Sequence, residues 1–231
     1  MSSRQAGRRI AAVVCEGQTD VPILRAALHE IWPELQEVRC LQPELDETHR
    51  AKGPAGWGHV KAWCEAHADD LEEVLSPDLG DPIDLLVIAI DVDIAIDAGI
   101  SDPPKRVGLY ETTRLREQMT AWLLEASSRG SLPSAVVLST PVMAIEAWII
   151  AALFPKQRSP EKLEDPAEAL VARKKLRRSA RDGKAWKEFH IYRDTFAPVV
   201  ARRLERVRKA CAEVERTLHA VEQRRLELDG Y

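Results

Sequence analysis

Short apolar runs alternate with helix-like segments through the first two thirds of this chain, and that alternation limits the folds it can adopt. The runs at 84–90 and 134–139 are short and almost continuously apolar, as in strands buried on both faces of a parallel sheet. We predict strands at 9–15, 35–41, 84–90 and 134–139, helices at 21–32, 58–75, 111–129 and 142–154, and loops at 42–58 and 94–110. This βαβαβαβα order predicts an α/β fold with a parallel four-stranded sheet flanked by helices on both faces.

The two ends of the chain differ in charge. Residues 151–231 contain 20 Lys and Arg against 13 Asp and Glu, a net +7, which leaves 13 against 24, or −11, for residues 1–150. We therefore expect an α/β domain over 1–154 and a basic α-helical extension over 155–231 that packs on it. An acidic part beside a basic part suits a phosphate-rich substrate bridged by metal. Helices that expose charged faces to solvent would give the same charge counts without any such substrate.

Length and composition exclude several classes of protein. With 231 residues, 45% hydrophobic and 30% charged, the chain can bury one core plus a small extra element. It contains no apolar run of roughly 18 residues and no start of signal-peptide type, so we expect a cytoplasmic protein without membrane contact. The cysteines are scattered, at Cys15, Cys40, Cys64 and Cys211, which favours free thiols over disulfides or a zinc site.

Carboxylates follow the first and third predicted strands. Glu16 comes directly after the first strand, and Asp91 and Asp93 follow the third. Ligands of parallel α/β sheets collect at the carboxyl ends of the strands, and residues two apart in an extended segment point the same way. Asp97 keeps that parity if the chain stays extended, and Asp20 lies where the first helix begins. Carboxylates gathered at one edge repel one another unless a cation joins them, so the pattern predicts a Mg²⁺ or Mn²⁺ site.

Some of these residues also have a purely structural explanation. Asp20 could simply cap a helix, and Asp91 and Asp93 could be polar residues that begin a loop. Glu16 is harder to explain in that way, because Asp, Asn or Ser caps a helix better than a glutamate placed four residues early.

The order of these motifs resembles a known family. A strand ending in E-G-x-T-D, from Glu16 to Asp20, is followed later by a strand ending in D-x-D, from Asp91 to Asp93. This resembles the Toprim domain shared by topoisomerases, bacterial primases, small RNA-maturation nucleases and OLD-family nucleases. The segment Pro141 to Trp148 and the residues Tyr192, Phe196 and Ala197 are similar to single-domain Toprim-like proteins of the DUF4276 group, which tend to be encoded beside ATPases in bacterial anti-phage loci.

The resemblance implies a function. It makes Glu16 a general acid or base and, together with Asp91 and Asp93, a ligand of Mg²⁺ or Mn²⁺, with Asp20 a further ligand or a partner of one. Glu146 matches the glutamate of the family's P-x-x-x-E-A-W segment, whose role stays open. The implied protein is a metal-dependent nuclease that cleaves DNA or RNA, the effector of a bacterial antiviral defence system controlled by a separately encoded ATPase. The chain has no topoisomerase tyrosine domain, Walker A motif or zinc ribbon, which argues against a topoisomerase, a self-sufficient ATPase or a primase.

The C-terminal part carries two further signals. Apolar residues recur at spacings of four and three at Val200, Leu204, Val207, Cys211, Val214, Leu218 and Val221. This seam predicts either a helix packed on its own α/β domain or a homo-oligomer interface of coiled-coil type. A dense basic cluster lies upstream, at Arg173, Lys174, Lys175, Arg177 and Arg178, where we expect contacts with the phosphates of nucleic acid.

A second class of function also fits the sequence, namely a non-catalytic Toprim-like regulatory or sensor subunit that binds an ATPase or a nucleotide. A phosphatase of haloacid-dehalogenase type shares the apolar run that ends in D-x-D, but in that superfamily the motif closes the first strand. The motifs do not distinguish DNA from tRNA or another RNA as the substrate.

Overall fold

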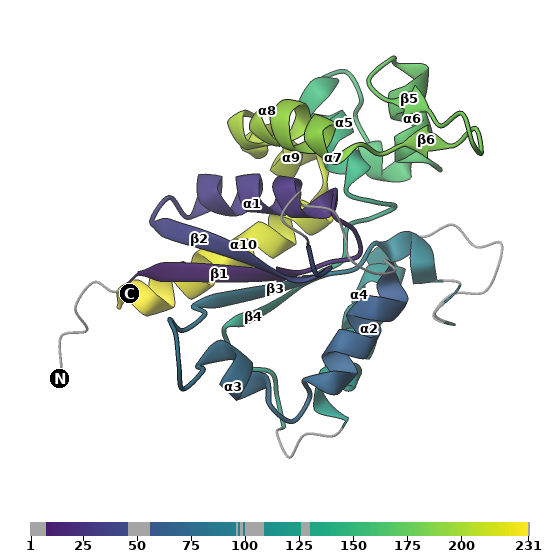
Figure 1. Ribbon diagram of the computed structural model, residues 1–231. Coiled ribbons are helices and arrows are strands. Elements are labelled where there is room, and N and C mark those ends of the chain that lie inside the picture. Colours follow the sequence, from purple (N-terminus) through teal and green to yellow (C-terminus); the bar gives the residue numbers. More distant parts are fainter. Residues whose placement is uncertain are drawn as a thin grey trace.

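The computed structural model describes residues 8–45, 56–95, 97, 99, 109–125 and 130–230. Its centre is a four-stranded parallel sheet of order β2-β1-β3-β4. The strands are β1 (Arg9–Val14), β2 (Leu35–Gln42), β3 (Leu85–Ala89) and β4 (Val136–Ser139). Each lies within two residues of its predicted position, and the predicted α/β class is confirmed. Because all four strands are parallel, their carboxyl ends meet at one edge of the sheet, on the right in Figure 1.

Alternate residues of the strands feed two separate cores. Ala11 and Val13 of β1 belong to one cluster of buried side chains, and Ala12 and Val14 belong to the other. On the first face lie α1 (Asp20–Ile31), α5 (Glu146–Leu153), α8 (Ala197–Arg202), α9 (Leu204–Ala210) and α10 (Ala212–Asp229). On the second face lie α2 (Trp57–Ala66), α3 (Leu71–Leu75) and α4 (Leu109–Leu124). The strand period of two therefore explains why continuously apolar runs are needed here.

Three predicted helices differ from the observed ones. The helix expected at 58–75 is two helices, α2 and α3, separated by a turn in which His67 Nδ1 lies 2.9 Å from Asp70 Oδ1. The helix expected at 142–154 begins only at Glu146, because Met143 has a φ of 67° that no α-helix allows. The third is the helix expected at 111–129, which is observed as α4 and spans Leu109–Leu124.

Parts of the predicted elements lie outside the described residues. These are 126–129 of the helix expected at 111–129, 46–55 of the first predicted loop, and 96, 98 and 100–108 of the second. A short 3-10 helix at Val92–Ala95 leads into the second predicted loop.

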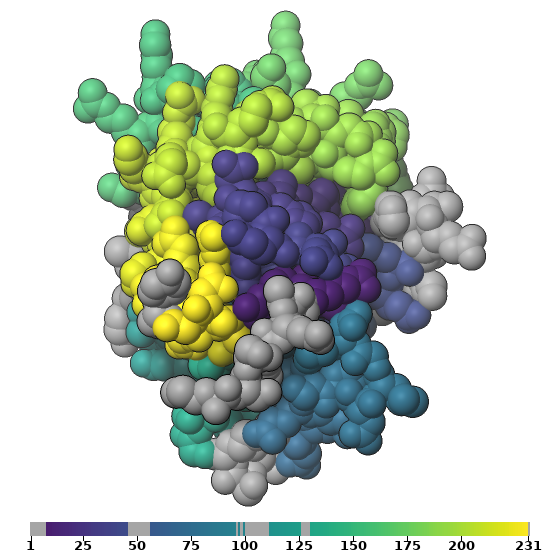
Figure 2. All heavy atoms as spheres, turned by 90° about the vertical axis from the view of Figure 1, so that its left-hand side faces the viewer, coloured from purple at the N-terminus to yellow at the C-terminus, as the bar shows by residue number. Residues whose placement is uncertain are grey.

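The C-terminal extension contains a β-hairpin that the sequence did not predict. A 3-10 turn (Pro160–Lys162) and α6 (Pro166–Ala172) come first, then the short antiparallel strands β5 (Arg177–Arg178) and β6 (Ala185–Trp186). After α7 (Phe189–Ile191) and a π-turn (Tyr192–Phe196), α8 to α10 return to the sheet. Figure 2 shows these last helices, green-yellow to yellow, directly against the blue-violet α1. The α6–hairpin part lies beyond the carboxyl edge of the sheet (Figure 1).

The apolar seam lies inside the protein. Each of its seven side chains is at most 3% exposed, and all belong to the core that also contains α1 and α5. The chain bends at Cys211, whose extended backbone separates α9 from α10. A coiled-coil interface through Val200 to Val221 is therefore the wrong alternative, because these side chains are already covered by the chain's own α/β domain.

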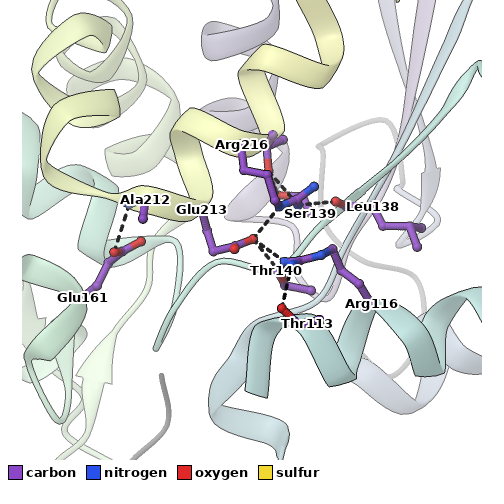
Figure 3. Close-up of polar contacts among 10 residues, drawn as sticks. Thr113, Arg116, Leu138, Ser139, Thr140, Glu161, Ala212, Glu213 and Arg216 are labelled. Carbon is purple, nitrogen blue, oxygen red and sulfur yellow. Dashed lines mark hydrogen bonds and ion pairs between the residues drawn. The ribbon is translucent and has the colours of Figure 1, made fainter. Parts of the chain in front are cut away.

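A hydrogen-bonded network fixes the start of α10 to the sheet (Figure 3). Glu213 Oε2 accepts hydrogen bonds from Arg116 Nη1 at 2.7 Å and from the Thr140 hydroxyl at 2.9 Å. It also accepts one from Arg216 Nε at 2.8 Å, and Arg216 donates to the carbonyl of Leu138 at the end of β4. Thus α4, β4 and α10 are joined at one buried carboxylate.

The structure also bears on membrane contact and on the state of the cysteines. In the described part of the chain, no helix combines the length and the apolar character needed to cross a membrane. All four cysteines are free thiols, as the sequence predicted.

Candidate active site

Five acidic side chains gather at the carboxyl edge of the sheet. Glu16 follows β1, Asp20 begins α1, Asp91 and Asp93 follow β3, and Glu146 begins α5 after β4. Their charges act on one another: Glu16, Asp20, Asp93 and Glu146 all raise the pKa of Asp91. The structure thus brings together four of the predicted site residues with Glu146, whose role the sequence left open.

Glu16 links the segments that follow the two central strands. Its Oε1 accepts a hydrogen bond from the backbone N–H of Asp91 at 2.7 Å. Burial raises the pKa of Glu16 to about 8, with contributions from the charges of Asp20 and Asp93, against the opposing effects of the Asp91 N–H and Lys187. A carboxyl group with such a pKa exchanges a proton near neutral pH, as a general acid or base must.

Asp20 is 9% exposed and also faces the cluster. Its Oδ2 accepts a hydrogen bond from the Gly17 N–H at 2.8 Å. Burial, followed by the charge of Glu146, raises the pKa of Asp20 to about 7. The N-cap residue of α1 is Thr19, whose side chain forms no capping bond, so Asp20 does not have the simple capping role that was considered for it.

The residues after β3 reach the cluster by a different path from the one predicted. The chain does not stay extended, because the 3-10 helix begins at Val92 and the N–H of Ile94 returns to the carbonyl of Asp91. The parity argument for Asp91, Asp93 and Asp97 is therefore wrong. Although Asp91 is only half-buried and Asp93 is exposed, loss of solvation beside the other acids raises the pKa of Asp91 well above its ordinary value and that of Asp93 to about 6. Asp97 is exposed, and its charge makes only a small contribution to the raised pKa of Asp93.

Glu146 is the most deeply buried acid of the cluster, with no exposed surface. Its Oε1 accepts a hydrogen bond from the Tyr192 hydroxyl at 2.6 Å and lies 2.8 Å from Lys187 Nζ. Its Oε2 is buried and has no hydrogen-bond partner. A buried carboxylate oxygen without a partner is costly, so this atom is available to a ligand.

Lys187 and Tyr192 are functional candidates that the site prediction missed. Burial alone would lower the pKa of Lys187, but the charges of Glu146, Asp91 and Asp20 raise it overall. Burial and then Glu146 raise the pKa of Tyr192. Lys187 is 42% exposed on its side chain, so its ammonium group stands between the acids and solvent. No local pattern marks Lys187, since it follows β6 in a segment far from the other site residues in sequence.

A cleft of about 550 Å³ opens beside the cluster, between the sheet edge and the hairpin. Its lining comes from Asp93, Met143, Ala144, Glu146 and Lys187 on one side and from 164–168, Arg178 and 182–185 on the other. Met143 holds a left-handed backbone, a conformation that costs energy for a residue with a side chain. The strained residue thus lies in the wall of the cleft.

The donor set fits a divalent cation of the hard type. Among the described residues, no three His, Cys, Asp or Glu side chains are arranged to enclose an ion. Mg²⁺ does not need such a cage, because it commonly uses one or two carboxylates and keeps several waters. Five carboxylates with one lysine, and the unpartnered Oε2 of Glu146, supply both the ligand chemistry and the excess negative charge. Asp91, Asp93 and Glu16, the ligands that the resemblance implies, do not form a three-ligand group in the described arrangement, so an ion there would need water as further ligands.

The basic cluster divides into two groups. The Arg173 guanidinium donates to Gln157 Oε1 at 3.0 Å and lies over the Phe154 ring, and Arg178 pairs with Glu168 at 2.7 Å. Lys174, Lys175 and Arg177 are exposed. Lys174, Lys175 and Arg177 are therefore available for the predicted phosphate contacts. Arg173 and Arg178 already have partners within the chain.

Comparisons with known proteins yield no relative. No family model, no curated protein and no solved structure matches the chain. The function is accordingly inferred from the chemistry of the site.

Proposed function

We propose that this protein is a Mg²⁺-dependent nuclease that hydrolyses phosphodiester bonds of DNA or RNA. The observation that carries the proposal is the charge imbalance at the sheet edge, where five acidic side chains are accompanied by Lys187 alone among the site's described residues. Such acids must either hold protons or bind a cation. A cation held there suits a phosphate ligand, which can bridge to it.

Each residue has a role in this reaction. Asp91 and Asp93 would hold the ion together with Glu16. When bound, Mg²⁺ polarises a phosphate and lowers the pKa of a water. Glu16 takes a proton from the attacking water or gives one to the leaving oxygen. Lys187, between Glu146 and solvent, contacts the phosphate and balances the charge that develops on it.

The Toprim resemblance supports the proposal, because the glutamate of E-G-x-T-D and the D-x-D meet at one edge, joined by the bond from the Asp91 N–H to Glu16. A role as the effector of a bacterial defence system, with activity controlled by a separately encoded ATPase, rests on that resemblance alone. We propose it as the biological setting.

Metal binding can be tested without an assay of activity. Mg²⁺ or Mn²⁺ at about 100 times its Kd should raise the Tm of the wild-type protein by roughly 5–10 °C. The double variant Asp91→Asn/Asp93→Asn should lose this rise. Asp78→Asn is the matched control, because Asp78 is exposed in the connection that enters β3 at its amino end. An equal metal response in the double variant would refute the proposed site.

Cleavage of labelled DNA and RNA tests the chemistry. Glu16→Gln keeps the shape of the side chain and its acceptor for the Asp91 N–H but cannot carry the proton. We expect its rate of cleavage to fall by roughly 100-fold or more, with the Asp78→Asn rate unchanged. If the wild type binds metal but cleaves no polynucleotide, with or without an ATPase partner, the non-catalytic regulatory subunit is the better assignment.

A further inference from the structure

The hairpin of β5 and β6 has two different faces. Arg177 pairs with Trp186 and Arg178 pairs with Ala185 across the antiparallel strands. Cross-strand partners share a face, and successive pairs alternate between faces. Arg178 and Ala185 line the cleft beside the acids. Arg177 and Trp186 therefore lie on the opposite, outer face of the hairpin.

Trp186 is unusually open to solvent. It is 50% exposed, one of three large hydrophobic side chains exposed in the described residues, the others being Leu79 and Leu226. An exposed indole offers a flat apolar face on which a nucleic-acid base can stack. Trp186 precedes Lys187 in sequence, and Lys187 Nζ lies 2.8 Å from Glu146. Adjacent residues therefore connect the outer face of the hairpin with the acid cluster.

Three cations lie at and just before the start of the hairpin, and one of them, Arg177, is the cross-strand partner of Trp186. Lys174, Lys175 and Arg177 are exposed, and in the described part of the chain none of them has an ion-pair partner. They line a hollow of about 280 Å³ together with Leu176, Glu188, His190 and Ile191. The acidic residue in this lining is Glu188, whose Oε2 lies 3.6 Å from His190 Nε2. Arg177 thus connects the exposed indole, its cross-strand partner, with a hollow that two further free cations line.

We infer that this outer face binds a single-stranded polynucleotide, with a base stacked on Trp186 and phosphates on Lys174, Lys175 and Arg177. Free cations fit the phosphates of any nucleic acid. A bare indole additionally favours a strand whose bases are unpaired, because a stacked duplex has no free base face to offer. The inference rests on the proposed nuclease function and names single-stranded polynucleotide as its substrate class. A strand bound on the outer face would pass the edge of the hairpin and reach the acids on the other side.

Binding of fluorescein-labelled oligo-dT and oligo-rU of about 15 nucleotides, measured by anisotropy in EDTA, tests the inference without cleavage. We expect both strands to bind more tightly than a duplex of equal length. Trp186→Ala should weaken strand binding by roughly 5- to 100-fold, whereas Trp186→Phe should retain most of it. Lys174→Ala/Lys175→Ala should weaken strand and duplex binding alike and reduce the salt dependence.

Matched controls separate this surface from general effects. Leu79→Ala removes another exposed apolar side chain, and Arg202→Ala/Lys209→Ala removes two exposed cations from α8 and α9; neither should change binding. Equal binding by Trp186→Ala and wild type, or tighter binding of duplex, would overturn the inference and leave metal-dependent cleavage untouched. Trp186-dependent strand binding without any metal-dependent cleavage would uphold the surface and refute the nuclease.

Discussion

Two polar clusters lie at the same edge of the sheet and have opposite electrostatics. Glu213 accepts hydrogen bonds from Arg116, Thr140 and Arg216. Burial would raise its pKa, but the bond and charge of Arg216 and the charge of Arg116 lower it overall. In the acid cluster, burial and like charges act in the same direction, and the pKa of Glu16 rises to about 8.

The difference shows that burial alone does not decide whether the pKa of a glutamate rises or falls. Both glutamates lose solvation, which disfavours the charged form. Two arginines compensate Glu213 within the fold, so this network is complete and holds α10 in place. The acid cluster has one lysine, and Oε2 of Glu146 has no partner. An incomplete cluster of this kind is suited to a ligand that supplies the missing charge.

The largest effect should come from breaking the complete network. Glu213→Ala leaves Arg116 and Arg216 without their shared carboxylate, and we expect a loss of about 3–5 kcal/mol in unfolding free energy, measured by urea denaturation. Glu215→Ala is the control on the same helix, since Glu215 pairs with Arg208 but its side chain is 50% exposed. That change should cost no more than about 1 kcal/mol. Equal losses in both variants would contradict the structural role of Glu213.

A change of opposite sign is expected in the acid cluster. Because the pKa of Glu16 is raised from 4.5 to about 8, the metal-free folded protein binds more protons than the unfolded chain in this window. Stability should therefore fall as the pH rises from about 4.5 to 8. Glu16→Gln removes the charge, so it should be about 1–3 kcal/mol more stable than wild type at pH 8 and nearly equal near pH 4.5, after allowance for partial exposure.

Urea denaturation across this pH range in EDTA measures the effect. A wild-type protein whose stability is constant or rises between pH 5 and 8 would show that the acids do not repel one another as the structure implies. Addition of Mg²⁺ should reduce the advantage of Glu16→Gln, because the ion replaces the missing proton.

The smallest effect is expected from Tyr192→Phe. This change removes the hydroxyl that donates to Glu146 at 2.6 Å but keeps the ring, which packs edge-on against Phe196. We expect a loss of about 1–2 kcal/mol at neutral pH, measured by thermal or urea unfolding. A loss as large as that of Glu213→Ala would place Glu146 in a complete structural network and weaken the contrast between the two clusters.

Much of the fold could be predicted because it depends on local patterns. A strand buried on both faces needs a continuous apolar run, and the runs at 84–90 and 134–139 give two strands almost at their observed bounds. Helix ends were less predictable. The left-handed residue at Met143 and the break between α2 and α3 have no counterpart in the apolar pattern from which the helices were predicted.

The candidate site shows the same division. Glu16, Asp91 and Asp93 could be identified because each follows a strand, and parallel strands bring their carboxyl ends together. Lys187 and Tyr192 could not, because they come from the last quarter of the chain and reach the acids only through the return of the extension over the sheet edge. The division of the basic cluster was equally hidden, since Arg173 and Arg178 find their partners only in the folded chain.

By itself, the sequence determined the α/β class, the strand positions and the acids that end β1 and β3, because apolar periodicity and strand order are properties of neighbouring residues. Only the tertiary structure decided which charges are compensated. Glu213 and Glu146 are both buried glutamates near helix starts, and nothing local distinguishes them. One faces two arginines and the other a single lysine, since electrostatic energies depend on distances in space that sequence separation does not give.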